Sequence, residues 1–136
     1  MKFLLGLAIV VSTNMVAIIG DIPAQVKKSF ETKFQTAKNV KWVKENAHEY
    51  EATFIFNDTQ CSANFSDKGE WLETEFLIKY DELPTEVKDA QKSIKNAKII
   101  AVATIESANA DIKYEIEYKQ GRKTKEVFYN KIGKKL

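Results

Sequence analysis

The sequence predicts an α+β fold built from two tandem copies of a unit that contains one helix and an antiparallel sheet. The segment Ile-Pro-Ala-Gln-Val at residues 22–26 recurs as Leu-Pro-Thr-Glu-Val at residues 83–87. After each of these segments the spacing of apolar residues changes from about four to two, which is the change from helix to strand. We therefore expect repeat one over residues 21–82 and repeat two over residues 83–136.

Each repeat is expected to begin with a helix that has one apolar face. Pro23 and Pro84 suit the first helical position, because the N–H that proline lacks has no partner there. Apolar residues then recur at helical spacing, at Ile22, Val26, Phe30 and Phe34 in repeat one and at Leu83, Val87, Ala90, Ile94 and Ala97 in repeat two. These stripes predict helices that pack against sheets.

Alternation of apolar and polar residues predicts the strands. They are expected over residues 38–44, 49–56, 59–65 and 71–78 in repeat one and over 98–106, 113–119 and 125–131 in repeat two. Asn57-Asp58, Ser66–Gly69 and Gln120–Arg122 have the composition of turns. A last strand would contain only residues 134–136, so we expect it to be truncated or missing.

One face of the predicted sheet is apolar and the other is mixed, because side chains alternate along a strand. The apolar face holds Tyr50, Ala52, Phe54, Phe56, Cys61, Ala63 and Phe65. The mixed face holds Glu51, Thr53, Ile55, Gln60, Ser62 and Asn64, with Glu115 and Glu117 in repeat two. We expect the apolar face to take the helix and the mixed face to meet water or a partner.

Residues 1–20 have the pattern of a secretory signal peptide. Lys2 is the only charged residue before Asp21, and an apolar run follows it. The alternative is an uncleaved anchor, but three polar residues interrupt the run and leave it short of the ~20 apolar residues that a span needs. We expect residues 21–136 to be one periplasmic or secreted domain without a membrane span. Cys61 is the only cysteine, so neither a lipid-anchoring cysteine nor an internal disulfide is expected.

Several short motifs together resemble a known family. They are the paired Ile/Leu-Pro-x-x-Val segments, the Tyr-Glu-Ala or Tyr-Glu-Ile of the second strand in each repeat, and Phe-Ser-Asp-Lys-Gly-Glu-Trp at residues 65–71. Over residues 21–136 the chain is similar to the PepSY-like, β-lactamase-inhibitor-protein-like family of small exported proteins, typical of Bacteroidetes. The resemblance implies two α-β4 units whose strands join into one curved sheet with the helices on one face. It also implies a role in binding or inhibiting other proteins, and it supplies no catalytic residues.

The residues that carry common catalytic or metal chemistry are few and poorly spaced. His48, the only histidine, lies in a predicted turn and lacks neighbours for a metal cage or a triad. Cys61 falls on the apolar face, where a thiol is inert, and a nucleophilic thiol is the alternative. The acidic residues lack the spacing of a calcium loop, and no glycine-rich phosphate loop is present. We expect no metal, no cofactor and no enzymatic activity.

Charge is unevenly distributed between the repeats. Residues 21–82 contain 8 lysines and 12 acidic residues, a net charge of −4, whereas residues 83–136 contain 12 basic and 7 acidic residues, a net charge of +5. A basic edge can bind an acidic partner, but lysines at a sheet edge also oppose aggregation, and we favour the second interpretation. We expect no nucleic-acid partner, because an exported protein rarely meets one.

The leading hypothesis is a non-enzymatic exported binding module that contacts a protein or peptide of the cell envelope through the mixed face. The expected contact residues are Trp71, Thr53, Ile55, Gln60 and Asn64. Trp71 belongs to this face only if the Leu72 side of its strand faces the helix; in the other register it is a core residue. Two alternatives stay open: an inhibitor of a secreted hydrolase of protease or β-lactamase type, and a small-ligand carrier or weak enzyme that uses Cys61.

Overall fold

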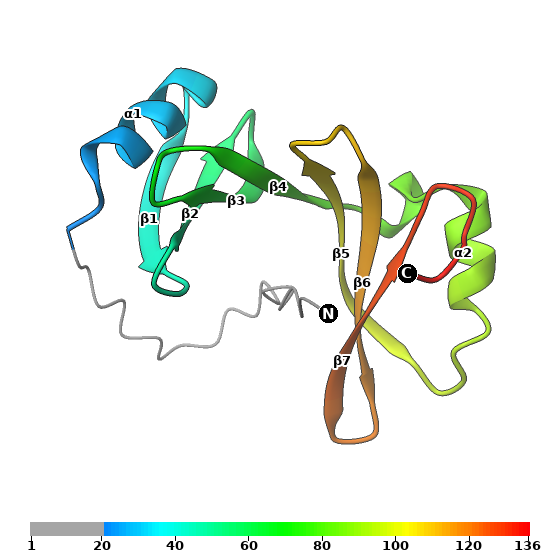
Figure 1. The fold of residues 1–136 in the computed structure, drawn as a ribbon. Coiled ribbons are helices and arrows are strands. Elements are labelled where there is room, and N and C mark those ends of the chain that lie inside the picture. The colour runs from blue at the N-terminus through cyan, green and yellow to red at the C-terminus, as the bar shows by residue number, and fades with distance from the viewer. Residues whose placement is uncertain (1–20) are drawn as a thin grey trace. The chain divides into compact units, whose positions relative to one another are not determined.

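The computed structural model describes residues 21–136, which form two α-helices, one short 3-10 helix and seven strands (Figure 1). The helices are α1 (Ala24–Lys33), η1 (Tyr80–Glu82) and α2 (Thr85–Gln91). The strands are β1 (Lys38–Lys44), β2 (Glu49–Phe56), β3 (Thr59–Ser66), β4 (Trp71–Ile78), β5 (Lys98–Ser107), β6 (Ile112–Gln120) and β7 (Lys123–Tyr129). The predicted signal peptide, residues 1–20, lies outside the described residues.

The seven strands form one sheet in which each strand neighbours the next along the chain, from β1 to β7. Their pairing is antiparallel. β2 and β3 are joined by Asn57 and Asp58, with φ of 49° and 60°, which are the positive angles that a tight two-residue hairpin turn requires. The predicted α+β class, with a helix followed by antiparallel strands in each repeat, is confirmed.

The helices lie close to the predicted places, but the first residue of both and the end of the second differ from the prediction. Pro23 and Pro84 each stand one residue before the helix, in an extended conformation, and not at its first position. The second helix ends at Gln91, earlier than its apolar stripe predicts, and Asn96 (φ 57°) turns the chain toward β5. Ile94 lies in this turn and packs against the second core. Its apolar side chain is therefore explained by packing, although the residue is not helical.

The first core lies between α1 and one face of the strands that follow it (Figure 1). Phe30 is at its centre and is 4% exposed. Its ring centroid lies 4.9 Å from that of Phe54 and 5.2 Å from that of Trp42, both edge to face. The other buried members are Ile22, Val26, Phe34, Tyr50, Ala52, Cys61, Ala63 and Phe65. The predicted apolar face of β2 and β3 is therefore confirmed.

The second core is built in the same way from α2 and β5–β7. Val87 of α2 and Ile116 of β6 are fully buried at its centre. Leu83, Val102, Tyr118, Val127 and Tyr129 complete it. At its border the Tyr80 hydroxyl donates to Gln91 Oε1 at 2.9 Å, which satisfies a buried side-chain amide.

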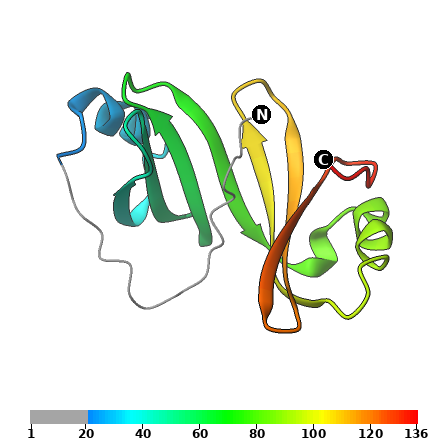
Figure 2. The ribbon, with the colours of Figure 1, turned by 60° about the horizontal axis from the view of Figure 1, so that its bottom comes forward.

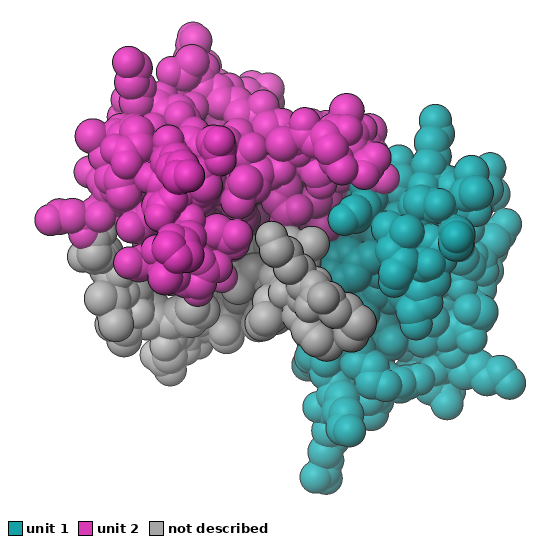
Figure 3. Space-filling view, in the orientation of Figure 1, with its two compact units in different colours: residues 1–15, 78–103, 113–136 teal, residues 16–77, 104–112 magenta. Residues whose placement is uncertain are grey.

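The described chain forms two compact units (Figure 3). The α1 unit, magenta in the figure, contains residues 21–77 and 104–112, and the α2 unit, teal, contains residues 78–103 and 113–136. The tip of the β5–β6 hairpin therefore belongs to the α1 unit. The amide of Ala108 in this tip donates to the carbonyl of Leu72 in β4 at 2.8 Å.

In each repeat one glycine-containing turn packs against the first turn of the helix of the same repeat. Gly69 (φ 84°) lies in the β3–β4 turn, and a Cβ on it would be 2.8 Å from the carbonyl oxygen of Gln25 in α1. Gly133 (φ 75°) lies in the turn after β7, and a Cβ there would be 2.4 Å from the carbonyl oxygen of Glu86 in α2. The turn and α2 lie side by side in both ribbon views (Figures 1 and 2). Only glycine allows this approach with positive φ.

The hydrogen bonds of the two turns also match. In the first, the amides of Ser66 and Gly69 donate to the carbonyls of residues 70 and 66, at 2.9 Å each. In the second, the amides of Asn130 and Gly133 donate to the carbonyls of residues 134 and 130, at 3.0 Å each. Residues 66–70 and residues 130–134 therefore have the same local structure.

The C-terminal end of repeat two differs from that of repeat one. Its last strand is reduced to a single bridge between Tyr129 and Lys135, which confirms that this strand is truncated. β7 starts at Lys123, two residues earlier than predicted, because the β6–β7 turn uses only Gly121 and Arg122.

Candidate binding surface

Four of the five predicted contact residues lie on one face of the sheet in the α1 unit. β2 supplies Thr53 and Ile55, and β3 supplies Gln60 and Asn64. Ile55 lies directly opposite Gln60 in the β2–β3 ladder. Their neighbours along each strand point into the α1 core, so the four point to the opposite side. All four are half-buried, and we call them the open-face patch.

Trp71 lies on the other face, against α1, so its assignment to the mixed face is wrong. It pairs with the core residue Phe65, and the centroid of its indole ring lies 3.6 Å from Lys33 Nζ of α1. Its indole N–H donates to Thr74 Oγ1 at 2.8 Å. A β-bulge next to the Phe65–Trp71 pair shifts the register, and this shift turns Trp71 to the helix side.

The mixed face is more buried than its composition predicts. Glu51 is 2% exposed and Ser62 is 4% exposed in the α1 unit. Glu115 and Glu117 of β6 are 3% and 2% exposed in the α2 unit. The mixed face was expected to meet water or a partner, whereas these four side chains on it are buried. Alternation along a strand shows which side a residue faces, but it carries no information about what packs on that side.

Glu51 has a strongly altered acidity. Its pKa is raised to about 7, chiefly by burial and further by the carboxylates of Glu45 and Glu73. Its Oε1 is buried without a hydrogen-bond partner among residues 21–136. A buried carboxylate without full pairing is costly, so the neutral acid is favoured up to neutral pH.

Replacing Glu51 with glutamine is expected to stabilise the protein at pH 8 by on the order of 2 kcal/mol and to change little at pH 4. A carboxyl group with a raised folded pKa binds its proton more tightly in the folded state. Its contribution to the free energy of unfolding is complete below about 4.5 and is lost as the pH rises through about 7. Urea denaturation at a series of pH values measures the effect.

The matched control for this experiment is Glu106→Gln, which removes an exposed carboxylate of the same unit. It should keep the pH dependence of the wild type. Parallel stability profiles for wild type and Glu51→Gln between pH 4 and pH 8 would contradict the assignment.

Cys61 is unsuited to nucleophilic chemistry. It is 1% exposed in the α1 core, and its Sγ donates to the Thr59 carbonyl at 3.4 Å. Burial raises its pKa to about 11. A nucleophilic cysteine needs access and a substantial thiolate fraction, and this site disfavours both.

A thiol reagent at pH 8 is expected to label Cys61 in the native protein at least about 100-fold more slowly than in denaturant, because labelling requires local opening. The release of the reagent's leaving group, followed over time, measures the labelling rate in the native protein and in denaturant. The control is Cys61→Ala combined with Thr36→Cys, which moves the thiol to an exposed position. Native labelling of Cys61 at the rate of this control would show that the thiol is accessible.

His48 lies in the β1–β2 turn, as predicted, and its side chain is 80% exposed. Its Nδ1 is 3.0 Å from Asp67 Oδ2, and the Asp67 amide donates to the His48 carbonyl at 2.8 Å. The hydrogen bond with His48 holds the pKa of Asp67 below its usual value. The pair therefore links two neighbouring turns. Among the described residues no three His, Cys, Asp or Glu side chains are placed to hold a metal ion.

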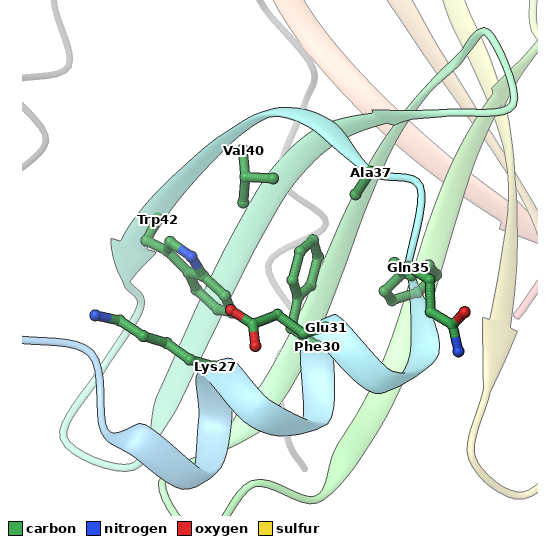
Figure 4. A pocket seen from close by; sticks show the side chains of 8 residues that line it. Lys27, Phe30, Glu31, Gln35, Ala37, Val40 and Trp42 are labelled. Carbon is green, nitrogen blue, oxygen red and sulfur yellow. The ribbon is translucent and has the colours of Figure 1, made fainter.

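Sequence reasoning missed a pocket between α1 and the edge strand β1 (Figure 4). Its volume is about 310 Å³. It is lined by Lys27, Phe30, Glu31, Phe34, Gln35, Ala37, Val40 and Trp42. In Figure 4 Lys27 and Glu31 come from the helix, whereas Val40 and Trp42 come from the strand. The available signal was Val40, an apolar residue that is 37% exposed on a lysine-rich strand.

The described fold and surfaces can be compared with known proteins. A family model described as "Putative beta-lactamase-inhibitor-like, PepSY-like" matches residues 12–56 and 48–134. The chain belongs to this PepSY-like family. A search among curated proteins finds no match. The two matched segments agree with the tandem repeat.

Crystal structures of Bacteroides proteins share the fold of this PepSY-like chain. A "putative periplasmic" protein of Bacteroides eggerthii has a TM-score of 0.77 at 18% identity, covering 86% of this chain and 87% of its own. A DUF2874 family protein of Bacteroides ovatus has a TM-score of 0.73 at 24% identity, covering 86% of each chain. A BLIP-like protein of Bacteroides fragilis has a TM-score of 0.69 at 20% identity, covering 84% of this chain and 83% of its own.

The helices of this PepSY-like chain are short. Within residues 21–136, neither α1 nor α2 has the length and the apolar composition that crossing a membrane requires.

Proposed function

We propose that this PepSY-like protein is an exported, non-enzymatic binding module, periplasmic or secreted, that contacts a protein or peptide through the open-face patch. The patch carries the proposal, because it places an apolar side chain, Ile55, among the polar groups of Thr53, Gln60 and Asn64 on the sheet face away from α1. Protein interfaces combine an apolar centre with hydrogen-bonding neighbours in this manner.

Two further observations support the proposal. Cysteine and histidine often act as nucleophile or base, but their surroundings here differ from those of a catalytic site. Cys61 is buried in a core, and His48 is exposed and paired with Asp67. Export is supported by the charge and apolar pattern of residues 1–20 and by the periplasmic description of the Bacteroides eggerthii structure.

The experiment compares Ile55→Arg with Ile132→Arg, which places the same charge on an isoleucine that is 73% exposed in the C-terminal turn. Tagged wild type and both variants are cross-linked in cell envelopes, and the captured proteins are quantified. A partner should be captured by the wild type and Ile132→Arg and lost with Ile55→Arg. The purified partner should then bind Ile55→Arg at least about 10-fold more weakly. Equal capture by all three proteins would refute the role of the patch.

A narrower candidate is an inhibitor of a secreted hydrolase. It is favoured by the family description and by the BLIP-like description of the Bacteroides fragilis structure. The test is titration of the purified protein against a panel of β-lactamases and extracellular proteases. Inhibition that Ile55→Arg weakens would support this candidate, and unchanged hydrolase rates at high micromolar protein would reject it.

A further inference from the structure

The two outer edges of the sheet differ in how the described chain covers them. The edge of β7 is partly covered, since Tyr129 forms a bridge with Lys135 and the amide of Leu136 donates to the carbonyl of Phe128 at 2.9 Å. β1 lies at the other end of the strand order, and no strand within residues 21–136 pairs with its outer side. An uncovered edge of this kind can accept another strand.

The backbone of β1 has hydrogen-bonding groups directed to this edge. The amide of Glu45 donates to the carbonyl of Glu49 at 3.0 Å, which identifies a bonded pair in the β1–β2 ladder. Bonded and non-bonded pairs alternate along an antiparallel ladder, and the register continues without interruption to Lys41. Trp42 and Lys44 therefore occupy the non-bonded positions, and their N–H and C=O groups point outward.

The pocket between α1 and β1 lies beside this outward-facing backbone. Trp42 pairs with Ala52, whose side chain is in the α1 core, so the Trp42 side chain is on the helix side and lines the pocket with Val40 and Phe30. A strand added outside β1 would direct alternate side chains to the same side. One of them would reach the pocket, whose volume of about 310 Å³ suits a bulky side chain.

The charge of this edge restricts what can bind. Lys38, Lys41 and Lys44 are exposed, β1 contains no acidic residue, and none of the three lysines forms an ion pair with a described residue. A second copy of the chain would bring the same three lysines against them, and like charges opposite each other destabilise strand pairing. Acidic side chains on an added strand would instead face these lysines favourably.

We propose that the edge of β1 and the adjoining α1–β1 pocket bind an extended acidic peptide segment, which pairs with the backbone of Trp42 and Lys44 and places one apolar side chain in the pocket. Main-chain hydrogen bonds supply affinity in this binding mode, and the pocket supplies specificity. The backbone groups and the pocket lie at the strand edge and on the helix side of the sheet, and the open-face patch lies on the opposite side. Lys38 and Lys41 border the patch, since they pair with Ile55 and Thr53.

A random ten-residue peptide library displayed on phage provides the test. It is panned on the wild type and counter-selected on Val40→Lys, which puts a charge at the pocket wall. We expect enrichment of peptides that carry an apolar residue between acidic residues. Fluorescence anisotropy of an enriched peptide should show binding at least about 10-fold weaker to Val40→Lys and to Lys41→Glu combined with Lys44→Glu.

Two controls separate this site from other surfaces. Methylation of alternate backbone nitrogens in the peptide keeps its charges and side chains, and it should weaken binding at least about 10-fold if the peptide pairs as a strand. Asn64→Arg, in the open-face patch, should bind the peptide as the wild type does. Absence of enriched peptides, enrichment of basic peptides, insensitivity to backbone methylation, or dimers that Val40→Lys dissociates would each overturn the proposal.

Discussion

Replacement of Phe30 with alanine is expected to lower the free energy of unfolding of the α1 unit by about 3–5 kcal/mol. The ring is 4% exposed and contacts the rings of Phe34, Trp42, Phe54 and Phe65, at centroid distances from 4.9 to 6.2 Å. Its loss would remove the side chain that joins α1 to three strands. Because small domains are stable by only about 5–15 kcal/mol, this loss is a large fraction of the unit's free energy of unfolding.

Urea denaturation followed by tryptophan fluorescence measures this loss, since both tryptophans, Trp42 and Trp71, belong to the α1 unit. Phe56→Ala is the matched control, because Phe56 is half-buried at the border of the same core. It should cost less than half as much as Phe30→Ala. If Phe30→Ala proves too unstable to fold, replacement with leucine can be used at both positions. Phe30→Leu should then cost more stability than Phe56→Leu. Equal losses at the two positions would contradict the central place of Phe30.

Gly133→Ala is expected to destabilise the α2 unit by roughly 2–5 kcal/mol. Two costs combine at this position. A left-handed backbone costs a non-glycine residue about 1–2 kcal/mol, and overpacking costs about 1–3 kcal/mol. Here the added Cβ would be 2.4 Å from the carbonyl oxygen of Glu86, a main-chain atom that cannot move without shifting the first turn of α2.

Gly121→Ala separates these two costs. Gly121 also has positive φ, 62°, but a Cβ there would meet nothing within 4 Å. Gly121→Ala should therefore have only the cost of the left-handed backbone, about 1–2 kcal/mol. Hydrogen exchange of α2 and β7 detected by mass spectrometry is a suitable measurement, because the tryptophans report on the other unit. The contact with α2 would be refuted if both variants lost the same stability.

Much of this fold could be predicted because both repeats use the same residue types at their helix starts, strand faces and turns. The Pro-x-x-Val segments start both helices, and alternation correctly assigned Phe54 and Cys61 to the core. The turn at Asn57-Asp58 followed from residues that tolerate positive φ. These features depend on interactions between residues close in sequence or on simple periodicity.

The features that escaped prediction depend on register and on tertiary packing. One extra residue in β4 reverses the side on which Trp71 lies, and a periodic pattern cannot locate such a bulge. The burial of Glu51 depends on what covers the mixed face, and the pocket beside Val40 depends on how α1 sits over the sheet edge. Neither leaves a periodic trace in the sequence.

The close approach of the glycine turn in each repeat to the helix of the same repeat has a consequence for how such a chain can arise. It brings residue 69 beside residue 25 in the first repeat and residue 133 beside residue 86 in the second. Because each of these contacts joins residues of the same repeat, such a unit can be copied and joined head to tail through a short connector, here residues 79–82 after β4, with both interiors left intact. The architecture is thus one that gene duplication reaches with little rearrangement.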